Sequence, residues 1–343
     1  MTERRGEREQ AGDGPRRELP IAVLTLNPSL DIGYEVKHLV ADQKTHAVAA
    51  RYDPGGNGIN LGRTLKTLGV RADTYCLVAG EIGRLVEQIA APSLDSLRCL
   101  HIPGETRVNC ALIQEEPRIQ YEVTADGAFV SPDALASIEA GFLCAAGAGF
   151  GVLTGSLPPG VPNTTYAKLV QRLRDQGARA IVDARPEFLG DVIAAHPFLI
   201  KPNRYELETL IGGPLPTLDD VARAAREVQR SGVPWVCVSL GAEGAVLAGA
   251  EVTLEAVPPP IAIRSTVGAG DAMLAGLVAG FAMGDAPDGA LRRAVACGSG
   301  TAEKPGTALC TAEDVARISR NVTVRTLPQS PSPEPPIVVR RRP

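Results

Sequence analysis

The chain has 343 residues, of which 44% are hydrophobic, and its formal net charge is -4 at pH 7. This length suits one large α/β domain or two small ones, and a slightly acidic chain without an internal basic block gives no electrostatic argument for binding nucleic acid. Residues 1–18 are polar and lack an apolar core, and no uncharged apolar stretch approaches the roughly eighteen residues of a membrane span, so we expect neither secretion nor membrane insertion.

Seven cysteines are dispersed along the chain without a CxxC pair. They also lack the Cys and His spacing that a structural zinc site requires. An odd and scattered set is typical of reduced thiols, so we expect a cytoplasmic protein.

The folded part is expected between two disordered tails, at residues 1–18 and in the Pro-rich segment 326–343. Between them, apolar runs alternate with helical patterns, which is typical of repeated βα units and a mostly parallel sheet. The expected strands are Ile21–Leu26, Thr74–Val78, Gly151–Thr154, Ala180–Val182, Phe198–Ile200 and Trp235–Ser239, followed by a hairpin at Ala245–Leu254. The expected helices include Asn60–Leu68, Thr164–Gln176, Leu218–Ser231 and Asp271–Met283.

Two stretches, Tyr34–Ala50 and Cys99–Val123, interrupt this alternation of strands and helices. Their residues alternate in polarity with no helix between the strands. The pattern predicts a separate small sheet of antiparallel strands, at about residues 32–50 and 101–125. Such a sheet can cover a ligand or pair with a second subunit.

A glycine cluster precedes the first expected helix. Gly55, Gly56 and Gly58 lie within four positions, so the backbone can approach a ligand closely. Asn60 follows at the start of the helix, where its amide can exchange hydrogen bonds with sugar hydroxyls. The cluster does not fit the dinucleotide-binding pattern, because no acidic residue ends a second strand in the required context.

Two further loops follow expected strands. The loop Gly155–Gly160 comes after the strand Gly151–Thr154, at the sheet edge where open parallel sheets bind ligands, although it also reads as an ordinary strand exit. In the segment that starts at Lys201, Asn203 and Glu206 are three residues apart and can organise water around Mg²⁺. An Asn cap with Glu at the third helical position explains the same pair equally well.

The strongest motif is Ser265–Leu274, in which Gly268-Ala269-Gly270 precede Asp271 and an apolar helix. So small a turn directs unpaired N–H groups outward at a helix N-terminus, which favours an anion such as a transferring phosphate. Asp271, at the edge of that pocket, can accept the proton of an attacking hydroxyl. The alternative is an Asp that only caps the helix after a glycine turn.

The order of these motifs resembles a known family. Asn27-Pro28-Ser29-Leu30-Asp31 is followed by GGNGIN, GSLPPG, KPNRYE, VSLGAEG, STVGAGD and GTALC. Together, from about residue 20 to 318, they are similar to the PfkB, or ribokinase-like, carbohydrate kinases, and most similar to the branch of minor 6-phosphofructokinases, 1-phosphofructokinases and tagatose-6-phosphate kinases. The resemblance implies a three-layer α/β/α kinase domain at about residues 19–325, with a mostly parallel sheet and a small β-sheet lid.

The resemblance also implies roles for residues of this chain. Asp271 would be the catalytic base, and the amides of Gly268, Ala269 and Gly270 would form the anion hole. Lys44 and Arg107 would place positive charge near a substrate phosphate. The implied sugar-side residues are Asp31, Gly55, Gly56, Asn60 and Ser156. The implied nucleotide and magnesium residues are Lys201, Asn203, Ser239, Gly241, Thr266 and, acting on Mg²⁺ through water, Glu206.

The implied substrates are ATP and a sugar phosphate, most simply fructose 6-phosphate, with Mg²⁺ and a monovalent cation such as K⁺ as cofactors and a homodimer formed through the lid. Three residues depart from the pattern: Asn57 where these families carry Lys or Gly, and Glu122 and His46 where minor 6-phosphofructokinases carry Arg. A carboxylate near a phosphate reverses an attraction. Fructose 1-phosphate, tagatose 6-phosphate, an unphosphorylated sugar or nucleoside, and a non-catalytic sugar-binding role therefore stay open as alternatives.

Overall fold

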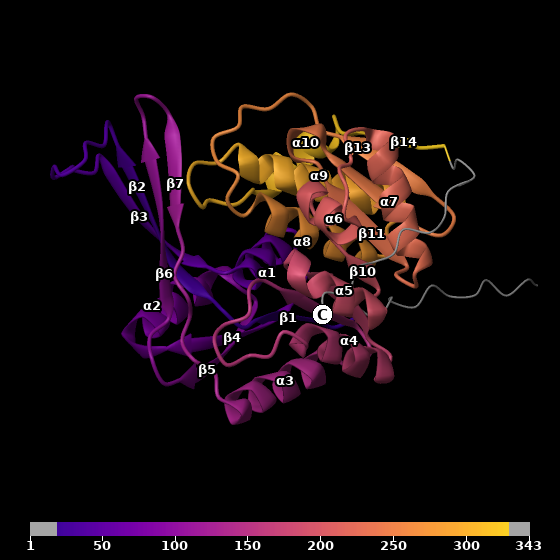
Figure 1. Cartoon of the computed structure of the whole chain (residues 1–343), viewed down its shortest axis with the longest axis horizontal. Helices are drawn as coiled ribbons and strands as arrows, with labels where there is room; N and C mark the ends of the chain where they lie inside the picture. The colour runs from indigo at the N-terminus through magenta and orange to yellow at the C-terminus, as the bar shows by residue number, and fades with distance from the viewer. Residues whose placement is uncertain (1–18, 329–343) are drawn as a thin grey trace, which may run out of the picture.

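A computed structural model describes residues 19–328 of the chain (Figure 1). The predicted tail at 1–18 lies outside the described residues, as does most of the predicted tail at 326–343. The start predicted for the second tail is wrong, because Thr326 ends a strand and Leu327 is buried. The apolar side chain of Leu327 packs into a core cluster before the Pro-rich segment begins.

The predicted α/β class with a mostly parallel sheet is confirmed. In the main sheet, neighbouring strands are parallel all the way from β11 through β10, β9, β8, β1 and β4 to β5. Strands β12, β13 and β14 add an antiparallel edge beside β11. In spatial order the ten strands are β14 (Thr323–Thr326), β13 (Thr253–Val257), β12 (Ala245–Ala248), β11 (Trp235–Ser239), β10 (Leu199–Ile200), β9 (Arg179–Asp183), β8 (Phe150–Thr154), β1 (Ile21–Thr25), β4 (Asp73–Ala79) and β5 (Ser96–Ile102).

Helices cover both faces of this sheet, so its strands are apolar on both sides. In β1, Ala22 and Leu24 belong to one core cluster while Ile21 and Val23 belong to the other, as expected for side chains that alternate across a strand. The first face carries α3 (Pro132–Ala146), α4 (Thr165–Asp175), α5 (Pro186–Ala194), α6 (Arg204–Ile211) and α7 (Leu218–Arg230). The second face carries α1 (Asn57–Thr67), α8 (Ala269–Met283), α9 (Pro287–Ala302) and α10 (Ala312–Ser319). Among residues 19–328, no helix is long and apolar enough to span a bilayer.

A second sheet of four strands stands at one side of the main domain, and we call it the lid (Figure 1). Its spatial order is β3 (Ala49–Gly55), β2 (Ser29–Val36), β6 (Arg107–Gln114) and β7 (Ile119–Val123). A third core cluster joins the lid to α2 (Gly80–Ala90), with Leu30 of β2 packed near Val86.

Two details of the predicted lid are wrong. The central pair, β2 and β6, is parallel rather than antiparallel, because both strands continue outward from strands of the main sheet that run in the same direction. Residues 99–102 belong to β5 of the main sheet and not to the lid. The short links 26–28 and 103–106 therefore tie the lid directly to the main sheet.

Candidate active site

The glycine turn forms the start of α8. The helix begins at Ala269, two residues before the predicted start, and Gly268 precedes it with φ 76°. A side chain at Gly268 would be strained, and its Cβ would lie 2.9 Å from Cδ2 of Leu309. The Ala269 N–H donates to the Thr266 carbonyl at 3.2 Å, whereas within residues 19–328 no acceptor is paired with the N–H of Gly268 or Gly270. These two amides can therefore donate to an anion at this helix N-terminus.

Asp271 lies in the first turn of α8 and is only 7% exposed. The side-chain amide of Asn57 donates to its Oδ1 at 2.9 Å, and that of Asn60 donates to its Oδ2 at 3.0 Å. Burial raises the pKa of Asp271 to about 7, and the two amide hydrogen bonds act against this rise. A carboxyl that titrates near neutral pH suits a general base.

Asp271 borders a polar cavity of about 310 Å³ between the lid and the main domain. The lid contributes both charged and neutral polar groups, and the main domain contributes the glycine turn and the start of α1. The lining residues are Ser29, Asp31, Gly56, Asn57, Asn60, Arg107, Asn109, Glu122, Thr266, Val267, Gly268 and Asp271. Five residues expected at the sugar or the base, namely Asp31, Gly56, Asn60, Arg107 and Asp271, thus surround one space.

Asp31 is held from its own strand and from β6. Its Oδ1 accepts from the Ser29 hydroxyl at 2.7 Å and from the Asn109 amide at 2.9 Å. Burial raises the pKa of Asp31 despite these bonds and the nearby Arg107. Gly55 makes room for the carboxylate without lining the cavity itself, since an added Cβ there would lie 2.2 Å from Oδ2 of Asp31. Both hydrogen bonds go to Oδ1, and within residues 19–328 no donor is paired with Oδ2, so this second oxygen can accept from a ligand.

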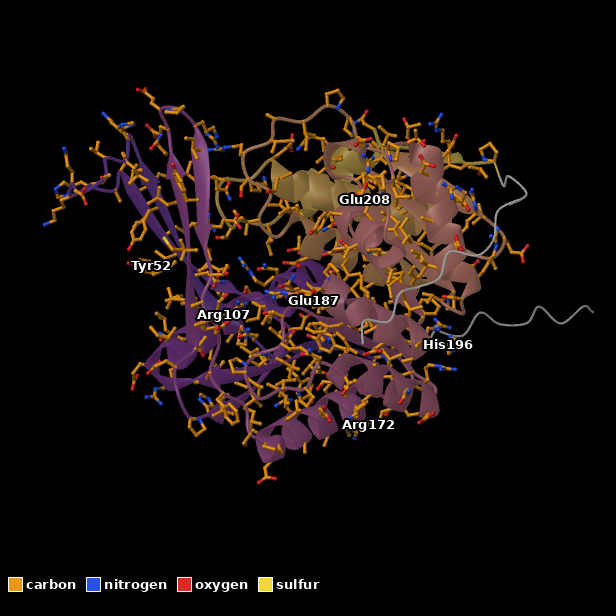
Figure 2. All side chains as sticks on the ribbon, in the orientation of Figure 1. Tyr52, Arg107, Arg172, Glu187, His196 and Glu208 are labelled. Carbon is orange, nitrogen blue, oxygen red and sulfur yellow. The ribbon has the colours of Figure 1, made fainter. Side chains whose placement is uncertain are left out.

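Arg107 begins β6 at the base of the lid (Figure 2). Its guanidinium donates to the carbonyls of Asn27 at 3.0 Å and Ala125 at 3.4 Å, and its buried Nε has no protein partner within residues 19–328. Burial lowers the pKa of Arg107, although Asp31 opposes this shift. An arginine held by carbonyls at a cavity wall keeps its full charge available to an anionic ligand.

Glu122 lines the same cavity from β7 and accepts from the Gln120 amide at 2.6 Å. Glu122, which stands where the resemblance to minor 6-phosphofructokinases implies Arg, therefore faces the candidate sugar space. His46 and Lys44, by contrast, are exposed in the connection 37–48 between β2 and β3 and do not line the cavity. The structure of one chain does not bring Lys44 to the expected phosphate position.

A second cavity, of about 460 Å³, lies on the other side of the turn and is mainly apolar. Three predicted nucleotide residues, Ser239, Gly241 and Thr266, are in its wall. The other lining residues are Ala242, Gly244, Pro258, Pro259, Pro260, Ile261, Ile263, Ala269, Gly270, Met273, Val295, Gly298, Ser299 and Ala302. Thr266 belongs to both cavities, so the turn separates them.

Lys201 is 5% exposed and pairs with Asp183 at 3.2 Å. Burial lowers the pKa of this lysine, but Asp183 and Glu206 outweigh that effect and the pKa is raised. A Cβ built on Gly270 would lie 3.8 Å from the Lys201 Nζ, which places this buried cation beside the glycine turn.

Asn203 and Glu206 form a reciprocal capping box at the start of α6. The Asn203 side chain accepts from the Glu206 N–H, and the Glu206 carboxylate accepts from the Asn203 N–H, each at 2.8 Å. Burial raises the pKa of Glu206. Among residues 19–328, no group of three or more His, Cys, Asp or Glu could hold a metal ion.

Ser156 does not line either cavity. Its hydroxyl accepts from the Asn27 side chain at 3.0 Å, between the main sheet and the link to the lid. Ser156 therefore contacts Asn27, whose carbonyl accepts a hydrogen bond from Arg107, and does not lie in the predicted cleft.

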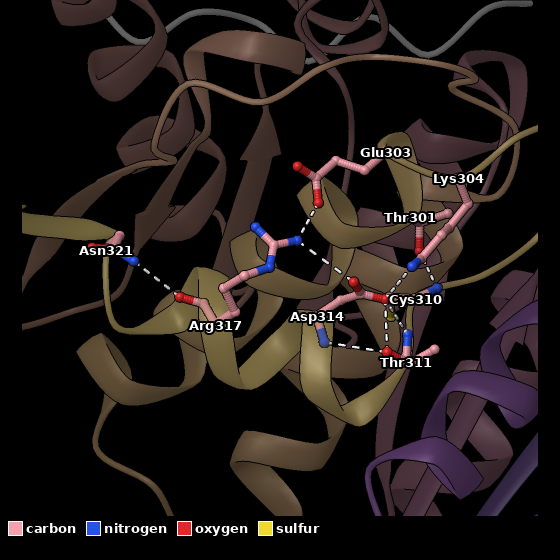
Figure 3. Close-up of polar contacts among 8 residues, drawn as sticks. All are labelled: Thr301, Glu303, Lys304, Cys310, Thr311, Asp314, Arg317 and Asn321. Carbon is pink, nitrogen blue, oxygen red and sulfur yellow. Dashed lines mark hydrogen bonds and ion pairs between the residues drawn. The ribbon is translucent and has the colours of Figure 1, made fainter.

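The loop after α9 lies against the glycine turn, since an added Cβ on Gly268 would be 2.9 Å from Cδ2 of Leu309. Its ends are fixed by a hydrogen bond from the Cys310 N–H to the Thr301 hydroxyl at 3.1 Å and by the ion pair of Lys304 with Asp314 at 2.6 Å (Figure 3). Within the loop, Thr307 donates to Asp53 of β3. The loop thereby connects the lid to the turn.

The sequence motifs predict no role for Asn109 or Asp183, and they mark Asn57 only as a departure from the family pattern. Asp183 ends a buried parallel strand, and that position alone could have marked it. Asn109 lies two residues after Arg107 and so shares its face of β6, which strand periodicity could also have indicated. The contact of Asn57 with Asp271 joins residues 214 positions apart, and no local pattern reports it.

The chain matches one protein family over most of its length. Residues 26–314 match the family described as pfkB family carbohydrate kinase. A 1-phosphofructokinase of Rhodobacter capsulatus is 37% identical over 314 residues, covering 90% of this chain and 99% of the relative. The ATP-dependent 6-phosphofructokinase isozyme 2 of Escherichia coli is 33% identical over 300 residues, covering 87% and 97%. The crystal structure of phosphofructokinase-2 from Escherichia coli in complex with substrates and products has a TM-score of 0.85 at 33% identity and covers 88% of this chain and 99% of that one.

Proposed function

Because this chain belongs to the pfkB family of carbohydrate kinases, we propose that it transfers the γ-phosphoryl group of ATP to a hydroxyl of a fructose phosphate, with fructose 6-phosphate as the leading substrate. The observation that carries the proposal is that a buried carboxylate, Asp271, and a cation, Arg107, line one polar cavity beside a helix N-terminus. The apolar cavity across the turn has the size and lining expected for a nucleotide base and ribose.

In this proposal Asp271 accepts the proton of the attacking hydroxyl. The free N–H groups of Gly268 and Gly270 stabilise the negative charge that develops on the transferring phosphoryl group. Lys201, buried beside the turn, adds a fixed positive charge. Asp31 and Asn60 hold sugar hydroxyls and so fix the attacking oxygen.

Mg²⁺ would neutralise charge on the ATP phosphates, with Asp183 and Glu206 meeting it through water. A related structure, of phosphofructokinase-2 from Escherichia coli, was solved in complex with potassium. We therefore propose K⁺ as a further cofactor of this chain, which the comparison of potassium with tetramethylammonium salts tests.

Fructose 1-phosphate is the second candidate substrate. The Rhodobacter capsulatus relative is named 1-phosphofructokinase, and Glu122 gives this cavity a carboxylate where the resemblance to minor 6-phosphofructokinases calls for Arg. Both candidates give fructose 1,6-bisphosphate, because fructose 6-phosphate would accept the phosphoryl group at C1 and fructose 1-phosphate at C6. The identity of the product therefore does not distinguish them, and the acceptor must be varied.

The proposed dimer rests on the face of the lid that points away from the cavity. Asp31, Arg107 and Glu122 alternate with apolar residues on their strands, so the opposite face carries Tyr121 and Val123, which are 44% and 66% exposed. Tyr52 of β3, 56% exposed, lies on this outer side (Figure 2). An apolar sheet face of this kind is expected to be covered by a partner, and we propose a second copy of the chain.

The test is a panel of fructose 6-phosphate, fructose 1-phosphate, tagatose 6-phosphate and free fructose, each assayed with ATP and Mg²⁺ in potassium and in tetramethylammonium salts. The control is Asp271→Asn, which should reduce turnover by about 10² to 10⁴ while leaving nucleotide binding intact. A variant that keeps more than about a tenth of the parent rate would remove Asp271 from the proposed role. A clear preference for free fructose would overturn the phosphosugar assignment.

A further inference from the structure

Both oxygens of Asp271 are held by amide side chains of the same helix. Asn57 is the first residue of α1 and Asn60 lies one turn later, and their Nδ2 atoms reach Oδ1 and Oδ2 at 2.9 and 3.0 Å. The two amides thereby fix the plane of the carboxylate. Each oxygen keeps a further lone pair for another donor.

The start of α1 is itself fixed. Gly56 precedes Asn57 with φ 112°, and a Cβ there would lie 3.1 Å from Cγ2 of Thr25. A Cβ on Gly58 would overlap the Thr25 hydroxyl at 1.9 Å. Because the backbone on either side of Asn57 packs this closely on β1, the amide is presented to Asp271 from a rigid element.

Asn57 is also the member of the pair that departs from the sequence pattern, because the resemblance described above implies Lys or Gly at this position. We propose that Asn57 is a positioning residue for phosphoryl transfer, which holds Oδ1 of Asp271 so that the carboxylate stays ionised and turned toward the acceptor hydroxyl. This inference rests on the proposed function, because it assumes that Asp271 is the base.

The charged surroundings of Asp271 come from several elements. Asp183, the last residue of β9, raises its pKa, and Lys201, directly after β10, lowers it. The lid adds Asp31, Arg107 and Glu122 to the wall of the same cavity. A substitution at Asn57 leaves all five groups in place, so a change in the titration of Asp271 reports the contact with residue 57.

The experiment compares the pH dependence of kcat/KM in the parent and in Asn57→Gly, Asn57→Lys and Asn57→Asp. Loss of the donor should move the acidic limb of the profile to higher pH by about one unit in Asn57→Gly. A cation should move it below the parent value, and a second carboxylate should move it furthest upward. The substrate phosphate ionises identically in all four assays, so a difference between them arises in the protein.

The order Lys, parent, Gly, Asp along the pH axis supports the inference, because a role in folding alone would not follow the charge at residue 57. An unchanged limb in all three variants, with only KM for the sugar altered, would make Asn57 a sugar contact and overturn it. Thermal unfolding and ATP binding identify any variant that fails to fold. If one of the three is lost in this way, the acidic limbs of the other two can still be ranked against that of the parent. Asp271→Asn separates the two claims. If Asp271→Asn is inactive while the acidic limb of the Asn57 variants does not move, only the role of Asn57 fails. If Asp271→Asn is active, the proposed base fails as well.

Discussion

The Asp31 carboxylate lies against the backbone of Gly55, where an added Cβ would be 2.2 Å from Asp31 Oδ2. Gly55→Ala should therefore displace Asp31 and raise KM for the sugar at least about tenfold, while the KM for ATP changes little. Gly213→Ala is a matched control, since nothing lies within 4 Å of its added Cβ. Equal effects of both changes on the sugar KM would show that Asp31 is not held in this way.

The pKa of Asp271, raised by burial from 3.8 to about 7, predicts a pH-dependent effect on stability. Folding favours the protonated carboxyl, so its contribution to stability is complete below the unfolded pKa and is lost as the pH rises through about 7. The amide side chain introduced by Asp271→Asn does not titrate. The melting temperature of Asp271→Asn minus that of the parent should increase between about pH 4 and 7 and then level off.

Thermal unfolding from pH 4 to 9 measures this difference, and Asp95→Asn, at an exposed carboxylate, is the control. A difference for Asp271→Asn that stays constant over this range would contradict a raised pKa in the folded protein.

Arg107→Ala should reduce kcat/KM for a phosphorylated substrate by the equivalent of about 1.5 to 3 kcal/mol, because a charge-assisted contact to the phosphate is lost. Free fructose should be affected much less, and so should the affinity for ATP. Steady-state kinetics of Arg107→Ala beside Arg98→Ala, an exposed position on β5, provide the comparison. Unaltered kinetics with every phosphosugar would sink the phosphosugar assignment.

Glu122→Arg should improve activity toward fructose 6-phosphate, on the order of tenfold in kcat/KM, because the charge facing the cavity changes sign. Gln120→Arg is the matched control, since Gln120 lies two residues away on the same face of β7 but does not line the cavity. If the natural substrate is a neutral sugar, the Glu122 variant should instead be harmful, because the carboxylate would then accept a hydroxyl hydrogen bond.

Tyr121→Asp on the outer face of the lid should weaken the proposed dimer and give monomers in sedimentation at micromolar concentration. Tyr205→Asp is the control, because Tyr205 is 71% exposed on α6 of the main domain. A parent protein that is already monomeric would rule out the dimer, and a dimer unaffected by Tyr121→Asp would move the interface elsewhere.

The parts of the site that could be predicted are those encoded in a few consecutive residues. The turn before Asp271 and the glycines before Asn60 follow from local backbone requirements. Side chains alternate between the two faces of a strand, which places Glu122 on the same face as Gln120. The parallel pairing of β2 with β6 was not predictable in this way, because it depends on where two distant strands leave the main sheet.

The same limit applies to side chains. Roles in substrate binding were predicted for Ser156 and Lys44 from their positions in the motifs. The hydroxyl of Ser156 instead accepts a hydrogen bond from Asn27, and Lys44 lies in an exposed connection. The clamp on Asp271 combines α1 with α8, so its second amide became visible only when both helices were in place.

Thr266 lies in the wall of both cavities, and this has a stereochemical consequence for the proposed phosphoryl transfer. Two substrates that meet across one short turn can exchange a phosphoryl group directly between oxygens, without a covalent enzyme intermediate. A single in-line displacement inverts the configuration at phosphorus. ATP made chiral at its γ-phosphorus with oxygen isotopes should therefore give a sugar product of the opposite configuration, whichever fructose phosphate is the acceptor.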